Sequence, residues 1–260
     1  MRTLLGLVTV ALLAAGCSGP ADRRSAPTGA EPPATPSSST PPGPEPERVR
    51  SSGAPEKKRG ADPGPAGFTA RVSPITPALR ERMSASHRPG CPVPLDRLRH
   101  LTLSYVGFDG RSRTGELVVA ARHADDVVSV FERLYDARFP IQRMRLVDAY
   151  GADDARSMAA NNTSAYNCRR VAGTDRWSEH AYGGAIDLNP VQNPYVQGAA
   201  FVPAEGAAYV DVPRGRGARA EPGVVVAGDV VDRAFASVGW EWGGRWRSSK
   251  DYQHFSASGG

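Results

Sequence analysis

Residues 98–106 alternate between apolar and polar positions with a period of two. Three residues would share one face of this stretch: Leu101, Leu103 and Tyr105. This period predicts a half-buried strand. An Asp-Gly pair at 109–110 and a second apolar run over residues 114–121 complete a predicted β-hairpin. His100 lies on the opposite face of the first strand, so we expect it to face solvent and to have no functional role.

Beyond residue 124 the apolar positions recur with the period of a helix. Five side chains follow this period: Val127, Val128, Phe131, Leu134 and Tyr135. Pro140 ends the predicted helix, and residues 141–150 alternate again, which predicts another strand. A second helix is expected to begin at a cap on Asp229 and to end before Gly239. These elements predict an α+β fold with a mostly antiparallel sheet and helices packed on it.

The N-terminal residues read MRTLLGLVTVALLAAGCSGP, a charged start followed by an apolar run and small residues. The run is shorter than the roughly 20 residues that a membrane span requires and is typical of an export signal. Residues 13–17, LAAGC, resemble the cleavage box of bacterial lipoproteins, although Ala14 stands where leucine is more usual. We therefore expect residues 1–17 to be a lipoprotein signal with a lipid anchor on Cys17. A plain secretory signal is the alternative.

Residues 18–67 have the composition of a tether. They hold 12 of the 23 prolines and almost no large apolar side chains, so they cannot bury enough surface to offset the entropy lost on ordering. We expect an extended, disordered linker that leads from a membrane anchor into the cell wall. The remainder, residues 68–260, has the length of one domain.

Cys91 and Cys168 remain once Cys17 is assigned to the anchor. An even pair in an exported domain predicts a disulfide. It would close a loop of about 77 residues and stabilise the fold by about 4 kcal/mol. The alternative is that Cys168 is a nucleophile or a zinc ligand. The formal net charge of +5 permits contact with acidic wall polymers, and no motif of a nucleic-acid-binding module is present.

The stretch WSEHAYGGAIDLNP places two metal-ligand residue types close together, His180 and Asp187. Their separation is not that of a ligand pair on a helix. Gly183 and Gly184 predict a tight turn with unusual backbone dihedrals. A strand that follows the turn would point Asp187 and Asn189 to the same side. The turn and strand could thus bring an imidazole and a carboxylate to one point.

A catalytic zinc ion needs three protein ligands and one open position. The third ligand is available in the C-terminal stretch GWEWGGRWRSSKDYQHF, where His254 is the last of five histidines and follows Asp251 by three residues. Tryptophans in this stretch could form a wall that excludes bulk water, or could be ordinary core residues: Trp240, Trp242 and Trp246.

These residues resemble the zinc D-alanyl-D-alanine carboxypeptidases and their relatives. The pattern S-x-H-x-x-G-x-A-x-D over residues 178–187 matches every fixed position of that signature, and KDYQHF is similar to its second motif. SMAANNTSAYNCR resembles the exported branch. The resemblance covers about residues 91–255 and extends to VanY-like DD-carboxypeptidases and L-alanyl-D-glutamate endopeptidases. It implies a hedgehog/DD-peptidase-like fold with the zinc site at the sheet.

The resemblance also implies roles for individual residues. His180, Asp187 and His254 would hold Zn²⁺, and Asp251 would be the general base. Many carboxypeptidase members have glutamate at the position of Asp251, and the shorter aspartate is more like the endopeptidase branch. Ser178 would hold the turn or a ligand in place; no nucleophile motif surrounds it.

Two arginines, Arg156 and Arg169, are candidates to bind a substrate carboxylate or a developing oxyanion, because guanidinium groups make two-pronged contacts. The resemblance implies one such arginine before the first zinc motif. The residues alone do not decide between these two.

The function that these residues predict is hydrolysis of peptidoglycan stem peptides by metal-activated water and a carboxylate base. The bond would be of the D-alanyl-D-alanine carboxypeptidase or the L-alanyl-D-glutamate endopeptidase type. The alternative is a non-catalytic, zinc-containing lipoprotein that binds the cell wall. Asp251 favours the enzyme, because a binding protein has no need of a base there. A serine or cysteine hydrolase lacks a supporting set of residues.

Overall fold

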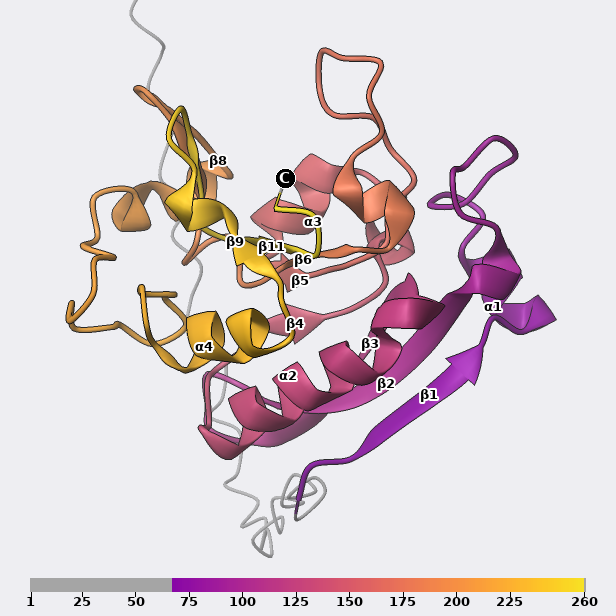
Figure 1. The fold of residues 1–260 in the computed structure, drawn as a ribbon, viewed down its shortest axis with the longest axis horizontal. Coiled ribbons are helices and arrows are strands. Elements are labelled where there is room, and N and C mark those ends of the chain that lie inside the picture. The colour runs from indigo at the N-terminus through magenta and orange to yellow at the C-terminus, as the bar shows by residue number, and fades with distance from the viewer. Residues whose placement is uncertain (1–66, 260) are drawn as a thin grey trace, which may run out of the picture. The chain divides into compact units, whose positions relative to one another are not determined.

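A three-stranded antiparallel sheet forms one layer of the fold (Figure 1). The computed structural model describes residues 67–259, so the predicted signal with Cys17 and nearly all of the predicted tether lie outside the described residues. Strand β1 (Ala70–Pro74) pairs with β2 (Leu98–Val106), which pairs in turn with β3 (Ser112–Ala120). The hairpin predicted from the alternating pattern is therefore confirmed.

One helix packs over one face of this sheet, and a second helix packs against it. Helix α2 (Ala124–Asp136) lies across β2, and α4 (Val230–Ser237) packs beside α2. The Asp229 carboxylate caps α4 by accepting a hydrogen bond from Asp232 N at 2.8 Å, as the sequence predicts. The largest core side chains fill the space between the layers: Leu101, Leu103, Leu117, Phe131, Leu134 and Phe235.

A second apolar cluster covers part of the opposite face of the sheet. Helix α1 (Pro77–Arg82) contributes to it and begins at Thr76, whose hydroxyl accepts from Leu79 N. The buried members are Leu79, Met83, Val93, Leu98, Val118, Leu146, Tyr166 and Cys168. A disulfide joins Cys91 to Cys168 at this cluster, as the cysteine count predicts. It therefore fastens the segment that follows Tyr166 to the loop after α1.

Short strands form the layer that carries the candidate chemistry. Strand β6 (Ala185–Asp187) pairs with β11 (His254–Ser256), which also pairs with β9 (Glu241–Trp242). A second small sheet has the order β10–β7–β8, and β4 and β5 form a parallel pair. These strands are β10 (Lys250–Asp251), β7 (Tyr195–Gln197), β8 (Ala200–Val202), β4 (Arg143–Met144) and β5 (Asn162–Thr163). All other pairs of named strands in residues 67–259 are antiparallel, in agreement with the predicted α+β class.

Helix α3 (Asp154–Ala159) and several single 3₁₀ turns complete the described elements. The turns are Leu95–Arg97, Ala121–His123, Val147–Tyr150, Glu179–Tyr182, Ala204–Tyr209 and Gly243–Arg245. Over residues 67–259, every helix is too short or too polar to cross a bilayer.

The strand predicted for residues 141–150 is wrong over most of its length. Only Arg143–Met144 is a strand, and Val147–Tyr150 is a 3₁₀ turn. The side chain of Asn162 replaces a strand partner, because its amide accepts from Arg145 N and donates to Arg145 O. The apolar side chains of this stretch are divided between the two clusters, with Ile141 and Met144 in the main core and Leu146 in the second cluster.

The expectation that His100 faces solvent is also wrong. Its side chain is only 15% exposed, and its Nε2 lies 3.0 Å from Oε1 of Glu116 on the neighbouring strand. Glu116 also forms an ion pair with Arg82 of α1. His100 therefore belongs to a polar cluster on the outer face of the sheet.

Candidate functional site

The first motif folds as a 3₁₀ turn followed by a strand. Ser178 precedes the turn, and its Oγ accepts a hydrogen bond from His180 N at 3.4 Å, so Ser178 caps the turn. The strand β6 then leads to Asp187. The predicted turn and strand are thus both present.

The two glycines of the motif are not equivalent. Gly183 has φ 64°, and a Cβ there would lie 2.5 Å from Ala120 N, so only glycine fits. Gly183 O accepts from Ala120 N at 2.9 Å, which fastens the turn to the end of β3. Gly184 lies outside the left-handed region, and a Cβ there would make an ordinary contact with His123. The prediction of unusual dihedrals therefore holds for Gly183 alone.

Strand pairing brings the second half of the site to the first. Asp187 and His254 are partners in the antiparallel register of β6 and β11, so their side chains leave the same face. On its other side, the backbone of Asp187 exchanges two hydrogen bonds with Ser164. The position of Asp187 is thus fixed from both sides by backbone contacts.

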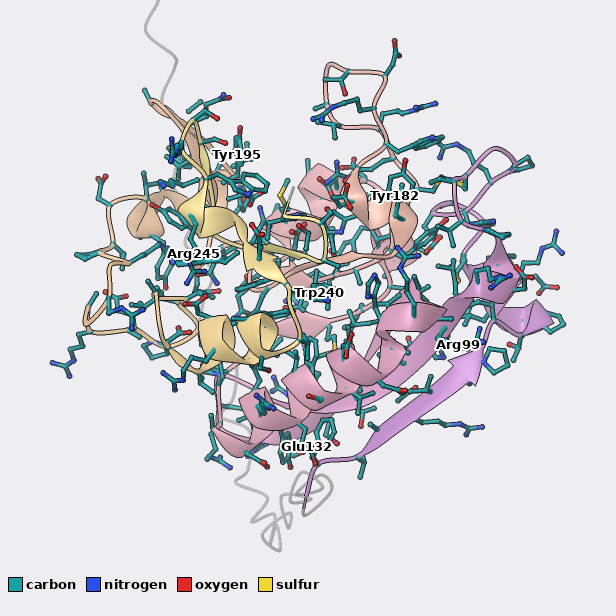
Figure 2. All side chains as sticks on the ribbon, viewed as in Figure 1. Arg99, Glu132, Tyr182, Tyr195, Trp240 and Arg245 are labelled. Atoms are coloured by element: carbon teal, nitrogen blue, oxygen red, sulfur yellow. A yellow bond between two sulfur atoms is a disulfide. The ribbon has the colours of Figure 1, made fainter. Side chains whose placement is uncertain are left out.

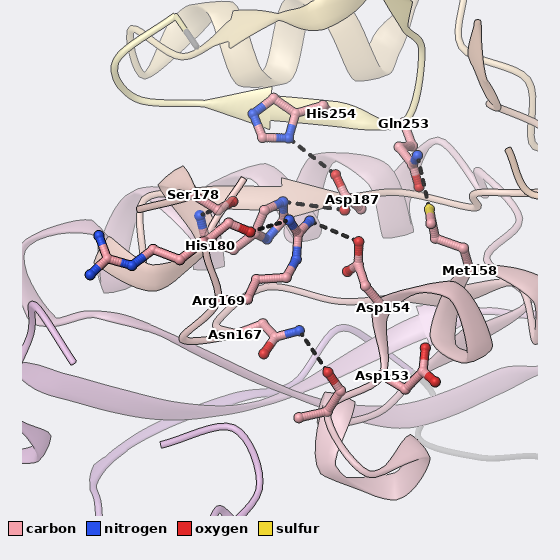
Figure 3. A network of polar contacts seen from close by, with 12 residues as sticks. Asp153, Asp154, Met158, Asn167, Arg169, Ser178, His180, Asp187, Gln253 and His254 are labelled. Carbon is pink, nitrogen blue, oxygen red and sulfur yellow. Dashed lines mark hydrogen bonds and ion pairs between the residues drawn. The ribbon is translucent and has the colours of Figure 1, made fainter. Parts of the chain in front are cut away.

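Three side chains converge at this point (Figure 3). His180 Nε2 lies 3.2 Å from Oδ2 of Asp187, and His254 Nδ1 lies 3.2 Å from Oδ1 of the same carboxylate. All three residues are buried, and one ligand atom from each lies within 4.8 Å of the other two.

The tautomer of His180 follows from its second nitrogen. His180 Nδ1 lies 2.6 Å from the carbonyl oxygen of Ala165, and a carbonyl can only accept, so Nδ1 carries the hydrogen. In the neutral imidazole the lone pair is then on Nε2, which faces Asp187. A backbone carbonyl that orients a histidine in this way is common behind metal ligands.

The charges in the cluster reinforce one another. Burial would raise the pKa of Asp187, but the imidazoles of His180 and His254 outweigh it and hold that pKa below its usual range. Burial would lower the pKa of His180, but Asp187 outweighs it and raises that pKa above its usual value. The Asp187 carboxylate is therefore ionised. It can bind a metal cation in place of the protons on the two imidazoles.

The donor set fits a zinc ion. Two imidazole nitrogens and one carboxylate are the ligands of many catalytic zinc sites. In a tetrahedral site with bonds of 2.0–2.1 Å, neighbouring ligand atoms are about 3.3 Å apart, close to the two 3.2 Å separations seen here. His180 Nε2, Asp187 and His254 Nδ1 would hold the ion.

Asp251 lies beside the three ligand residues. Its Oδ1 is buried and has no hydrogen-bond partner among the described residues. Burial raises the pKa of Asp251 to about 6, and the nearby charge of Asp187 adds to that rise while His254 opposes it. Gly243 allows the close approach, because a Cβ there would lie 3.0 Å from Asp251 Cβ and 3.4 Å from His254 Cβ. A half-buried carboxylate next to the ligand set can act as a base.

The three tryptophans divide between the site and the core. The ring of Trp246 lies against His254, with centroids 5.4 Å apart. Trp242 is buried and donates from Nε1 to Tyr252 O, and Trp240, labelled in Figure 2, packs against His123. Only Trp246 therefore borders a ligand residue directly, and the other two are core residues.

The structure brings one of the two predicted arginines to the ligand set. Arg169 forms an ion pair with Asp154 at 2.8 Å, and the charges of both act on His180. Arg156 is exposed on α3, and its guanidinium lies near the backbone of Gly151. Asp154 was not identified from the sequence, because a contact between residues 154 and 169 leaves no periodic signal.

Asn189 was expected to continue the strand and to point to the same side as Asp187, and this prediction is wrong. Strand β6 ends at Asp187, and Asn189 has φ 44°, which turns its side chain away. The Asn189 amide instead accepts from Gln142 N and donates to Pro140 O. Its role is to fasten the loop that leaves the strand.

Two surface cavities lie away from this cluster, with volumes of about 450 and 470 Å³. Neither lining contains a ligand residue or Asp251. The candidate site is therefore defined by its chemistry and not by the size of a pocket.

Comparison with known families identifies the same region. Residues 172–257 match the family model described as D-alanyl-D-alanine carboxypeptidase. The suspected family is confirmed over these residues. The match contains all three ligand residues, Asp251 and both motifs, and it ends just after β11. Arg169 and Asp154 precede it. Neither the search of curated proteins nor that of solved structures found a match.

Proposed function

We propose that this protein is a zinc-dependent metallopeptidase that hydrolyses peptidoglycan stem peptides, of the D-alanyl-D-alanine carboxypeptidase or L-alanyl-D-glutamate endopeptidase type. One observation carries the proposal. His180, Asp187 and His254 form a buried ligand set, and the carboxylate of Asp251 beside it has an oxygen without a partner. The family match supports a peptidase. A DD-peptidase-like fold belongs to the same proposal.

Each residue of the proposed site has a separate role. Asp251 accepts a proton from the attacking water at Oδ1 and returns it to the amine that leaves. Arg169 provides donors for a substrate oxygen, and Trp246 limits the access of water next to His254. Zinc, when bound, supplies a Lewis acid for the peptide carbonyl and lowers the pKa of water.

Digestion of purified muropeptides tests the proposal. The domain is incubated with and without a chelator, and products are identified by mass spectrometry. We expect loss of one terminal amino acid or cleavage within the stem, abolished by the chelator and restored by zinc. If zinc-loaded protein releases nothing yet sediments with cell walls, the non-catalytic binding function replaces this one.

We also propose that the protein is located in the cell envelope. The Cys91–Cys168 disulfide supports it, because disulfides persist in oxidising compartments. The anchor at Cys17 is tested by labelling cells with a fatty acid that carries a clickable tag. Label on the wild type and none on Cys17→Ser is expected. Equal label on both would remove the anchor from the proposal.

A further inference from the structure

The ion pair between Asp154 and Arg169 joins two segments at the edge of the ligand set. Arg169 Nη2 lies 2.8 Å from Oδ2 of Asp154, and about 30% of each side chain is exposed. Figure 3 shows the guanidinium directed toward the Asp154 carboxylate, next to the labelled His180. The pair is therefore neither fully in the core nor free on the surface.

The backbone of Arg169 is fixed on both sides. Arg169 O accepts from Ser178 N at 3.0 Å, and Arg169 N donates to Asn167 O at 2.8 Å. The preceding residue, Cys168, is held by the disulfide to Cys91. Only the side-chain torsions of Arg169 remain to be set, and Asp154 holds one end of the guanidinium.

Asp154 is itself held in place. It is the first residue of α3, whose cap is the Asp153 carboxylate accepting from Arg156 N at 3.1 Å. Asn167 Nδ2 donates to Ala152 O at 3.3 Å and ties the start of this helix to the segment that carries Arg169. The carboxylate thus projects from a fixed point.

The guanidinium of Arg169 has hydrogen-bond donors that Asp154 does not use. Its Nε is buried and has no hydrogen-bond partner among residues 67–259, and its Nη1 reaches only Arg170 O at 3.5 Å. A buried donor without a partner costs about 1–3 kcal/mol. A carboxylate takes two donors of a guanidinium at once, side-on at Nε and Nη2 or end-on at Nη1 and Nη2, so a substrate carboxylate would share Nη2 with Asp154.

We infer that Asp154 is a positioning residue: it aims the spare donors of Arg169 at a free carboxylate of the substrate. This inference rests on the proposed function for its substrate class. A purely structural ion pair would instead stabilise the fold and leave substrate preference unchanged. A positioning role therefore predicts that loss of Asp154 changes the preference for ligands with a free carboxylate, whereas a structural role predicts no change.

Binding to metal-free protein tests the inference without turnover. The probe is a tripeptide ending in D-alanyl-D-alanine, compared with the same peptide as its C-terminal amide, by titration calorimetry. We expect the wild type to prefer the acid by roughly ten- to a hundredfold. Asp154→Asn and Arg169→Met should each remove most of that preference, and the double variant should add no further loss.

A matched control breaks an ion pair elsewhere. Glu116→Gln makes the same change of acid to amide against Arg82 on the sheet, and it should keep the preference. Asp154→Asn should still bind zinc, because Asp154 is outside the set His180, Asp187 and His254. The inference is overturned if the wild type binds acid and amide equally, if Asp154→Asn keeps the full preference, or if the two losses add. A wild type that prefers the acid but cleaves nothing overturns the proposed function alone.

Discussion

His180 contributes a single defined tautomer to the candidate site. Its Nδ1 hydrogen bonds to the Ala165 carbonyl at 2.6 Å, so Nε2 is the nitrogen that could bind a metal ion. The carbonyl comes from the residue after Ser164, which pairs with Asp187. One short segment therefore fixes both the position of Asp187 and the orientation of His180.

The raised pKa of His180 would make the proposed zinc binding sensitive to acid. A metal ligand must be deprotonated, and a raised pKa keeps the imidazole protonated up to a higher pH than an ordinary histidine. We therefore expect zinc affinity to fall as pH falls through this raised value. Competition with a fluorescent chelator between pH 5.5 and 8 measures it. Affinity that stays level across this range would contradict the prediction.

In the proposed function, Asp251 would set the acid limit of activity. Its pKa of about 6 means that less of the base is ionised as pH falls below that value, and a bound cation would move the limit lower. We expect kcat/KM to fall tenfold per pH unit on the acid side, beginning at or below about pH 6.

The same residue can be tested by removing its charge. Asp251→Asn should keep the zinc ion and lose turnover by about 10²–10⁴-fold, the usual contribution of a general base. Zinc content by elemental analysis and initial rates on muropeptides are measured together. Normal hydrolysis by this variant would assign the base elsewhere.

At the scale of an element, the turn 179–182 depends on one glycine. Gly183→Ala places a Cβ 2.5 Å from the Ala120 backbone at a φ of 64°, so we expect a loss of at least about 1–2 kcal/mol and weaker zinc binding. Gly184→Ala is the matched control, since its Cβ would meet His123 at 3.6 Å. Denaturant unfolding of both variants checks this. Equal losses would show that the turn has no special need of Gly183.

Regular elements could be read from the sequence, whereas irregular ones could not. The hairpin of β2 and β3 and helices α2 and α4 have clear periods, and α4 also has its side-chain cap at Asp229. Residues 141–150 look like a strand, but the side chain of Asn162 satisfies the backbone of Arg145. A side chain 17 residues away leaves no mark on the local pattern.

The same distinction applies to the site. The three candidate ligand residues and the candidate base are chemically distinctive and stand in recognisable motifs. The Ala165 carbonyl is invisible in a sequence because every residue has one. The pairing of Asp154 with Arg169 depends on tertiary structure, as does the choice of Arg169 over Arg156.

At the scale of the whole molecule, the disulfide spans 77 residues and fastens the second apolar cluster. Replacing both cysteines, Cys91→Ala with Cys168→Ala, should cost about 4 kcal/mol of unfolding free energy in the chain-entropy model. Denaturant unfolding measures it. Reductant should weaken the wild type and leave the double variant unchanged. An equal stability of the two proteins would mean that the packing alone holds this segment.

The ligand set depends on backbone pairing between β6 and β11, while the chain between them makes a long excursion through the exposed residues 215–217. A protease cut at those residues would leave Asp187 and His254 on separate polypeptides that still share one sheet. Such halves are a natural pair for fragment complementation. Their reassociation should be driven by zinc, so mixing them would turn the domain into a sensor in which metal concentration controls assembly.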